Sequence, residues 1–360
     1  MPSRRRLARR SPLIAERFAA QLLAGEPATS AGAVVRRLLA VQGQDPRGAR
    51  LAIRARSAGL RAADVDRALT IDRSLLITWL NRGTLHLIAS EDFWWLHALT
   101  TPQQAAGCAR RLAQEGVPPD DADKAVGVIE TALGSDGPLT RRQLGERIAK
   151  AGVRTQGQAL VYLLFLASAR GIIVRGPMIG PAGPAEHGFV LVRDWLGAAP
   201  PIDRDLALAE LARRYLAGHG PAADRDLAKW AGLPLRDVRR GLTAIAGELR
   251  ERDDGLAELA AGQGQSAGAG GESRLPPARL LGPFDPVLHG WVDREPILGP
   301  QRQIVTVNGL FRPFALVAGR AVATWRLAGG QVTLKPFGPL SEPVTTALAA
   351  DAADVCRFLG

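Results

Sequence analysis

The sequence contains little cysteine and little histidine. Its 360 residues include two cysteines, Cys108 and Cys356, which lie far apart in the chain. Two such cysteines are typical of free thiols rather than of a disulfide or a zinc site. The five histidines are scattered as well, without the spacing that metal ligands show. We therefore expect no metal and no other cofactor.

The sequence also lacks a long apolar run. No stretch reaches about 18 apolar residues, so we expect neither a membrane span nor a membrane partner. The basic N-terminus is not followed by the apolar region of a signal peptide, because Glu16, Arg17 and Gln21 interrupt residues 13–25. These features favour a cytoplasmic protein.

Lysine is scarce, yet the chain is strongly basic. Lys and Arg together number 46 against 35 Asp and Glu, which gives a net charge of +11. Residues 1–60 alone hold twelve arginines and three acidic residues. A GC-rich genome would explain arginine in place of lysine, but it explains this clustering less well. Clustered positive charge is typical of a surface that neutralises phosphates, so we predict binding to double-stranded DNA. The arginines predicted to contact DNA here are Arg4, Arg5, Arg6, Arg9, Arg10, Arg36, Arg37, Arg47, Arg50 and Arg54.

Two glutamines, Gln42 and Gln44, lie inside this basic segment. If the segment is extended, residues i and i+2 point to the same side, so the two amides would face one target with Asp45 beside them. The tripeptide Gln-Gly-Gln is by itself only weak evidence for a functional site. A second Gln-Gly-Gln, at Gln263 and Gln265, falls in a Gly- and Ser-rich stretch that is typical of a linker.

A helix–turn–helix pattern recurs along the chain. Its clearest copy is a predicted helix at 224–231, a turn at Gly232 and a second helix from Leu235. An earlier copy at 139–169 is followed by two strand-like runs, and the first hundred residues repeat the pattern more loosely. We therefore predict an α+β fold with three tandem winged-helix units before a β-rich C-terminal region.

The predicted organisation has five segments. They are winged helix 1 at 1–105 with a basic N-terminal arm, winged helix 2 at 120–200, winged helix 3 at 203–255, a flexible linker or loop at 256–277 and the β-rich region at 278–360. In the β-rich region short strands are predicted at 280–285, 303–307, 314–317, 321–327 and 331–335, followed by a helix at 343–358.

Four blocks of the sequence resemble the AlkZ-like and YcaQ-like DNA glycosylases. In chain order the blocks are 38–46, 79–87, 284–294 and 317–325. The resemblance implies tandem winged helices around a concave basic face, with catalysis by the Gln-x-Gln motif. It also implies excision of bulky alkylated purines, including crosslinks made by antibiotic alkylators, in housekeeping repair or self-resistance. The middle residue of the motif is usually aliphatic in that family. Here it is Gly43, which predicts looser positioning of Gln42 and Gln44.

The chemistry of this reaction suits neutral amides. Alkylation at guanine N7 or adenine N3 makes the base cationic, so it leaves as a neutral base with little acid assistance. The barrier lies in the oxocarbenium-like sugar and in the water that must reach it. Amide oxygens can orient that water and stabilise developing positive charge. We predict these roles for Gln42 and Gln44, with Asp45 as a weaker candidate.

Several other residues have a structural and a functional interpretation. His86, on a predicted strand, either packs in the core or has a role in DNA contact or the active site. Asp285, Asp293 and Arg294 form either a buried salt-bridge network, which we favour, or a contact to substrate. Arg294 is therefore a weaker candidate for DNA binding.

Two alternatives to a crosslink glycosylase remain open. A winged-helix transcription regulator would need a dimer and a palindromic site, whereas we expect a monomer. A repair glycosylase of broad specificity would act on monoadducts without unhooking crosslinks.

Overall fold

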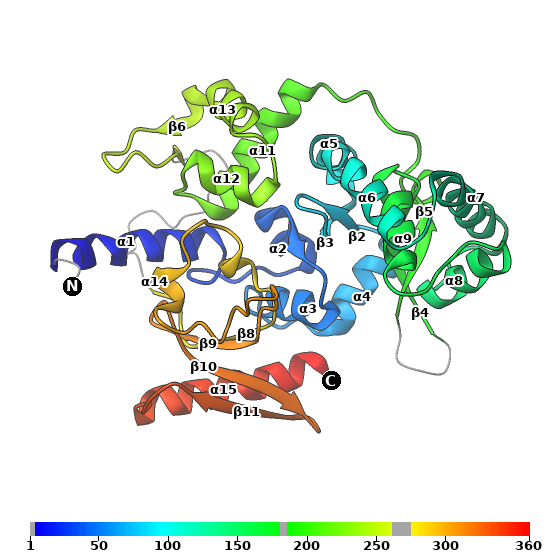
Figure 1. Cartoon of the computed structure of the whole chain (residues 1–360). Helices are drawn as coiled ribbons and strands as arrows, with labels where there is room; N and C mark the ends of the chain where they lie inside the picture. The colour runs from blue at the N-terminus through cyan, green and yellow to red at the C-terminus, as the bar shows by residue number, and fades with distance from the viewer. Residues whose placement is uncertain (1–3, 181–185, 261–274) are drawn as a thin grey trace. The chain divides into compact units, whose positions relative to one another are not determined.

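The computed structural model describes residues 4–180, 186–260 and 275–360, with side chains from residue 12 onward. The chain forms two compact units, of which one contains Met1–Val65 and Leu208–Gly360 and the other contains Asp66–Ala207. The two ends of the chain therefore fold together, drawn in blue and in yellow-green to red in Figure 1. The predicted segment 1–105 is shared between the units, and the five predicted segments stay a prediction.

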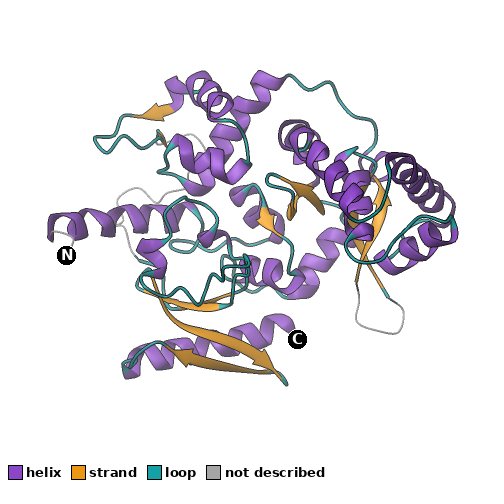
Figure 2. Cartoon of the chain, in the orientation of Figure 1, coloured by secondary structure: helices purple, strands orange, loops and turns teal. Residues whose placement is uncertain are grey.

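Helices and strands both contribute substantially, which confirms the α+β class (Figure 2). The helices of the first unit are α1 (Arg4–Ala20), α2 (Ala31–Leu38), α3 (Pro46–Arg54), α12 (Asp224–Ala231), α13 (Leu235–Ala244), α14 (Glu295–Leu298) and α15 (Glu342–Leu359). Its strands are β1 (Val41–Gln42), β6 (Leu249–Arg250), β7 (Glu258–Leu259), β8 (Arg279–Leu281), β9 (Phe314–Val317), β10 (Arg320–Ala328) and β11 (Gln331–Pro336). Two helices cross the boundaries between units, α4 (Ala62–Thr70) and α11 (Arg204–His219).

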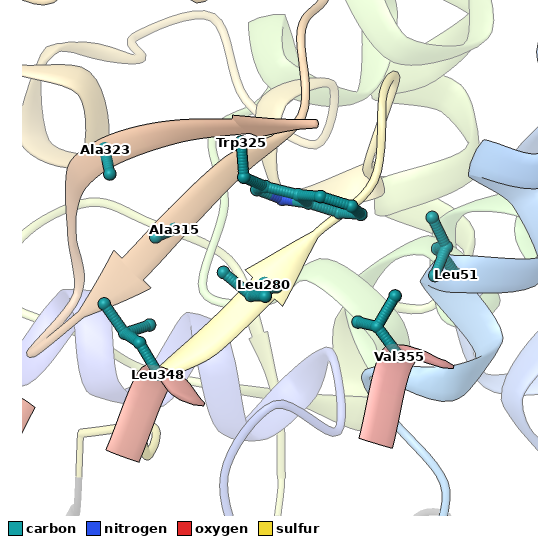
Figure 3. Close-up of a cluster of buried hydrophobic side chains, with 7 residues drawn as sticks. All are labelled: Leu51, Leu280, Ala315, Ala323, Trp325, Leu348 and Val355. Carbon is teal, nitrogen blue, oxygen red and sulfur yellow. The ribbon is translucent and has the colours of Figure 1, made fainter. Parts of the chain in front are cut away.

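Helix α3 packs against the hydrophobic core of the C-terminal sheet. The antiparallel strands of this sheet follow the order β11-β10-β9-β8. Leu51 of α3 joins Leu280, Trp325 and Val355 in one buried cluster, in which α15 supplies Val355 (Figure 3). The Trp325 indole also donates to the Leu281 carbonyl at 2.9 Å. The helix that follows the glutamine motif is thus packed against residues more than 200 positions later in the sequence.

One strand predicted in this region is absent from the described residues. Residues 303–307 form no ladder. Only Val305 pairs there, in an isolated bridge with Phe311. The apolar alternation suggested a strand, but the Asn308-Gly309 turn folds the segment back on itself within a few residues.

The helix–turn–helix near residue 230 forms as predicted. α12 ends at Ala231, Gly232 takes a left-handed conformation with φ of 69°, and α13 begins at Leu235. Glycine adopts this conformation without the steric cost that a side chain brings. The short antiparallel pair β6–β7 follows the two helices.

The second unit combines helices with an antiparallel sheet. Within this unit the strands follow the order β3-β2-β4-β5, and β2 is buried along its whole length. The strands are β2 (Leu75–Leu80), β3 (Thr84–Ala89), β4 (Ile173–Ile179) and β5 (Glu186–Leu191). The helices are α5 (Phe93–Thr100), α6 (Pro102–Gln114), α7 (Pro119–Asp136), α8 (Arg141–Lys150), α9 (Ala159–Ala169) and α10 (Val192–Leu196).

Both cysteines are free thiols, as predicted. In the part of the chain that the structure describes, no helix is long and apolar enough to cross a membrane.

Candidate active site

The two glutamines of the motif contact each other directly. Gln42 closes the short strand β1, and its Nε2 donates a hydrogen bond to Oε1 of Gln44 at 2.5 Å. Gln42 is 6% exposed, whereas Gln44 is exposed to solvent. The prediction that both amides lie on the same side is confirmed. Gly43 between them is buried.

This hydrogen bond fixes which way the Gln42 amide points. Because its nitrogen faces Gln44, its carbonyl oxygen must face away from Gln44. Among the residues that the structure describes, none donates a hydrogen bond to this buried Gln42 Oε1. A buried acceptor without a donor costs on the order of 1–3 kcal/mol. The carbonyl oxygen of Gln42 is therefore a buried acceptor without a donor among the described residues.

Asp45 has a structural role in the same segment. It precedes α3 with an extended backbone, and its Oδ1 accepts from the Gly48 amide at 2.7 Å. Pro46 occupies the first turn of the helix. An aspartate cap followed by proline is a strong start signal, because both suit the unpaired amides there. The sequence thus fixes the point at which the chain turns from the glutamines into the helix.

The start of α3 lies directly against the loop that follows β8. A Cβ atom added to Gly48 would lie 2.4 Å from the carbonyl oxygen of Pro283, so only glycine permits this approach. A Cβ atom added to Gly282 would lie 2.9 Å from Cβ of Leu51 in the same helix. The residues just after block 38–46 and just before block 284–294 are therefore in contact here.

A buried ion pair ties the other end of α3 to the same loop. Arg56 and Asp285 are both fully buried, and the guanidinium binds the two carboxylate oxygens at 2.9 and 2.7 Å. Gln21 of the segment after α1 accepts a further bond from Arg56. The favoured interpretation of Asp285 as part of a buried salt bridge is confirmed. Asp293 is exposed, and it accepts from the Glu295 amide at the start of α14.

The predicted DNA-binding arginines differ in their surroundings. Arg36 and Arg47 are exposed. Arg37 is half-buried and donates to the Ala20 carbonyl, while Arg50 is 8% exposed and donates to the Pro46 carbonyl. The side chains of Arg4, Arg5, Arg6, Arg9 and Arg10 lie outside the described residues; the backbone there begins α1.

Arg54 requires a correction. It is 3% exposed and binds both oxygens of Asp351, one oxygen of Asp354 and the carbonyl of Leu280. All of these partners lie in the C-terminal region, so Arg54 anchors α3 to β8 and α15. A guanidinium with its donors engaged in this way has little left for a phosphate, and we remove it from the DNA-binding set.

His86 and Arg294 also have partners within the protein. Burial lowers the pKa of His86 to about 3, and its Nδ1 lies 2.8 Å from the Thr84 carbonyl. This neutral, buried ring favours packing over a contact with DNA. Arg294 is half-buried, donates to the Leu288 carbonyl at 2.5 Å and lies over the ring of Phe311.

Sequence reasoning missed Gln21 and Arg56 as supports of the site. In the sequence Gln21 stands out only because it interrupts an apolar run. It shares a helical face with Ile14 and Phe18, at intervals of four and three residues, and both are buried. A polar residue on a buried face is a signal that could have been used. Nothing in the sequence distinguishes Arg56 from an exposed arginine such as Arg47.

A further Gln-Gly-Gln occurs in the second unit. Gln156 and Gln158 are both exposed, and Gly157 between them has a positive φ of 63°. The segment is a turn that leads into α9, with Gln158 at the cap position. The same three residues therefore take a different backbone, which shows that the geometry of 42–44 comes from its surroundings.

Comparisons with known proteins identify the family of the chain. The chain is 28% identical to the interstrand DNA cross-link repair glycosylase of Streptomyces sahachiroi, over 97% of this chain and 96% of that protein. The solved structure of the Streptomyces sahachiroi DNA glycosylase AlkZ is similar, with a TM-score of 0.77 and 25% identity, over 97% of this chain and 96% of that one. The DNA glycosylase AlkZ-like family matches residues 35–358. The resemblance read from the four sequence blocks is confirmed, and the chain belongs to the AlkZ-like DNA glycosylase family.

Proposed function

We propose that this glycosylase excises alkylated purines from double-stranded DNA and unhooks interstrand crosslinks made through them. The observation that carries the proposal is the hydrogen-bonded pair of Gln42 and Gln44, with the Gln42 carbonyl left as a buried acceptor. The relative from Streptomyces sahachiroi, whose name states crosslink repair, supports the substrate class.

In the proposed reaction the bond between C1′ and the purine nitrogen breaks. The cationic base takes the bonding electrons and leaves neutral, a water oxygen bonds to C1′, and the water proton passes to solvent. Gln42 Oε1 accepts a hydrogen bond from this water and lies near the developing sugar cation. Gln44 holds the Gln42 amide in the required orientation. Neither amide titrates, so both act at any pH at which the fold is intact.

Asp45 enters this proposal as a positioning residue. One of its oxygens already caps α3, so its main effect is to hold Gln44 at the start of the helix. Arg36 and Arg47, exposed near the motif in sequence, are proposed to contact phosphates.

We also propose that the three helix-containing segments are winged helices that act together as a monomer on duplex DNA. The best-defined of them is α12–Gly232–α13 with the β6–β7 pair. Size-exclusion chromatography with light scattering tests the oligomeric state. A dimer that protects a palindromic site would instead favour a transcription regulator.

The decisive experiment measures excision of N7-methylguanine from duplex DNA, followed by alkaline cleavage at the abasic site. We expect the variant Gln42→Ala/Gln44→Ala to lose at least about a hundredfold in rate. The matched control is Gln156→Ala/Gln158→Ala, which alters the same tripeptide at exposed positions and should keep the wild-type rate. Unchanged excision by the first variant would remove catalysis from the motif.

A duplex with one guanine–guanine crosslink through N7 atoms tests the finer claim. Release of separate strands on a denaturing gel supports unhooking. Excision of the monoadduct with no release of strands from the crosslink would favour a glycosylase of broad specificity.

A further inference from the structure

Arg175 lies in the sheet of the second unit, on β4 between β2 and β5 (Figure 1). Its guanidinium carbon is 5.1 Å from the ring centre of Trp79 on β2 and 4.9 Å from that of Phe189 on β5. Both rings are buried, so they are themselves fixed by the core. The two aromatic side chains therefore hold the guanidinium in a defined position.

This guanidinium lacks an anionic partner in the part of the chain that the structure describes. Within those residues Arg175 forms no ion pair and no hydrogen bond, and its Nε is buried without an acceptor. Buried charges in proteins are normally paired, because taking a charge out of water is unfavourable. Arg54 and Arg56 of the first unit follow this rule, since each binds a carboxylate. Arg175 departs from it.

The local electrostatics oppose the charge on Arg175. Burial is the main cause that lowers the pKa of Arg175 to about 10, and the positive charge of Arg141 lowers it further. The carboxylate of Glu186 acts the other way, but from beyond the reach of an ion pair. The guanidinium is still protonated at neutral pH, because its pKa lies well above 7. An anion bound from solution would relieve this unfavourable arrangement.

Arg141 supplies a second cation close to the same position. It is the first residue of α8, and Leu139 just before that helix pairs with Phe189 through two backbone hydrogen bonds, of 3.2 and 2.8 Å. This bridge fixes the start of α8 against the strand that carries one of the two rings. Arg141 is exposed, and among the described residues it has no acidic partner. Neighbouring guanidiniums that are not neutralised by carboxylates are suited to a phosphate.

We propose that Arg175 and Arg141 bind one phosphate of the DNA backbone. The inference rests on the proposed function, since the phosphate belongs to the same substrate. All of the arginines predicted from the sequence to contact DNA lie in the first unit, so this contact brings the sheet of the second unit into DNA binding. The planar guanidinium of Arg175 presents its two terminal nitrogens to phosphate oxygens, and it loses little freedom on binding because the rings already hold it. Such a contact positions a duplex without reading its sequence, which suits an enzyme that must act wherever a lesion lies.

The test is the salt dependence of DNA binding by the full-length variant Arg175→Met, whose unbranched apolar side chain can still pack between the rings. The substitution is made in the Gln42→Ala/Gln44→Ala background, so that binding is measured without excision. We expect the affinity for duplex DNA to fall about tenfold at low salt, and the slope of log affinity against log salt to decrease by about one.

The matched control is Arg110→Met, which removes an exposed arginine from α6 of the same unit. It changes the net charge equally and should leave affinity and slope nearly unchanged. Equal effects of the two substitutions would overturn the site, because Arg175 would then act only through net charge. An unchanged slope in Arg175→Met would overturn it as well, whatever the effect on stability.

A second measurement follows the guanidinium itself. The NMR signal of the Arg175 Nε–H group, identified by its absence in Arg175→Lys, should shift when a short duplex is added. A shift with inorganic phosphate but not with the duplex would assign the site to a free phosphate and overturn the DNA contact. A shift with polyglutamate alone would point to an acidic protein and overturn it too. A shift with the duplex, in a wild-type protein that excises nothing, would support the phosphate contact and defeat the proposed function.

Discussion

Arg56 and Asp285 form an ion pair from which solvent is completely excluded, and it joins residues 229 positions apart. Removing one partner leaves a buried charge without compensation, which costs about 3–5 kcal/mol. We therefore expect Arg56→Met and Asp285→Asn each to lower the free energy of unfolding by about that much. Urea denaturation followed by circular dichroism measures the change.

The control for this pair is Arg142→Met, which removes an exposed ion pair with Glu146 on α8. It should leave the unfolding midpoint nearly unchanged, because exposed pairs contribute little. The double variant Arg56→Met/Asp285→Asn should be less damaging than the sum of the two single variants. If Arg56→Met were as harmless as Arg142→Met, the pair would not hold α3 to the loop after β8.

A second prediction concerns Gly48, where α3 contacts the loop after β8. A methyl group there would meet the Pro283 carbonyl at 2.4 Å, and that backbone can move only with its loop. We expect Gly48→Ala to lower stability by about 1–3 kcal/mol through overpacking and to slow excision. Gly127→Ala on α7, with open space around the new methyl group, should instead stabilise by about 0.5–1 kcal/mol. Equal effects of the two substitutions would contradict a tight contact at Gly48.

Asp45 can be assigned by comparing two substitutions. Asparagine keeps a side-chain oxygen that can accept from the Gly48 amide, whereas alanine does not. If Asp45 acts by capping, Asp45→Asn should keep stability and nearly all excision activity, while Asp45→Ala should lose about 1 kcal/mol of stability. Excision assays and urea denaturation on both variants distinguish a capping role of Asp45 from a direct role in the reaction. A large loss of rate in Asp45→Asn with stability intact would make the carboxylate a direct participant.

His219 predicts how stability depends on pH. Burial lowers the pKa of this histidine to about 3, so the folded protein keeps it neutral where the unfolded chain, near its ordinary value of 6.5, takes up a proton. Stability is therefore full above that ordinary value and falls as the pH drops from 6.5 toward 3, by up to about 1.4 kcal/mol per pH unit.

The variant His219→Gln isolates this contribution. It should reduce the slope of unfolding free energy against pH between about 6 and 4. At pH 8 both proteins are neutral at this position, so any difference there reports lost packing against Tyr215 and Trp230. Parallel slopes for the two proteins would show that His219 is not held neutral.

Local patterns predicted the local structure well. The helices α12 and α13 begin where the sequence indicated, because Gly232 and Pro234 mark the turn between them. The strands β9, β10 and β11 and the helix α15 also form as predicted, within one or two residues. The two-residue period of a strand predicted that Gln42 and Gln44 lie on the same side, and their amides do meet, although the strand itself ends at Gln42.

Long-range contacts could not be predicted in this way. Arg47 and Arg54 look alike in sequence, yet one is exposed and the other is fixed by Asp351, which lies 297 positions away. The same holds for the partners of Arg56. Which arginine is buried depends on how distant segments pack, and a charge count treats every arginine as a possible contact with DNA.

The first unit is built from both ends of the chain, which affects how the enzyme can fold during its synthesis. Gln42 and Gln44 emerge from the ribosome early, but Asp285 and Asp351, which fix the helix after them, are added far later. At ordinary rates of synthesis the delay is on the order of ten seconds or more. Throughout that interval the residues that fix the helix after the motif, Asp285 and Asp351, have not yet been added. A prematurely terminated chain would therefore carry both glutamines and still be inert toward DNA lesions.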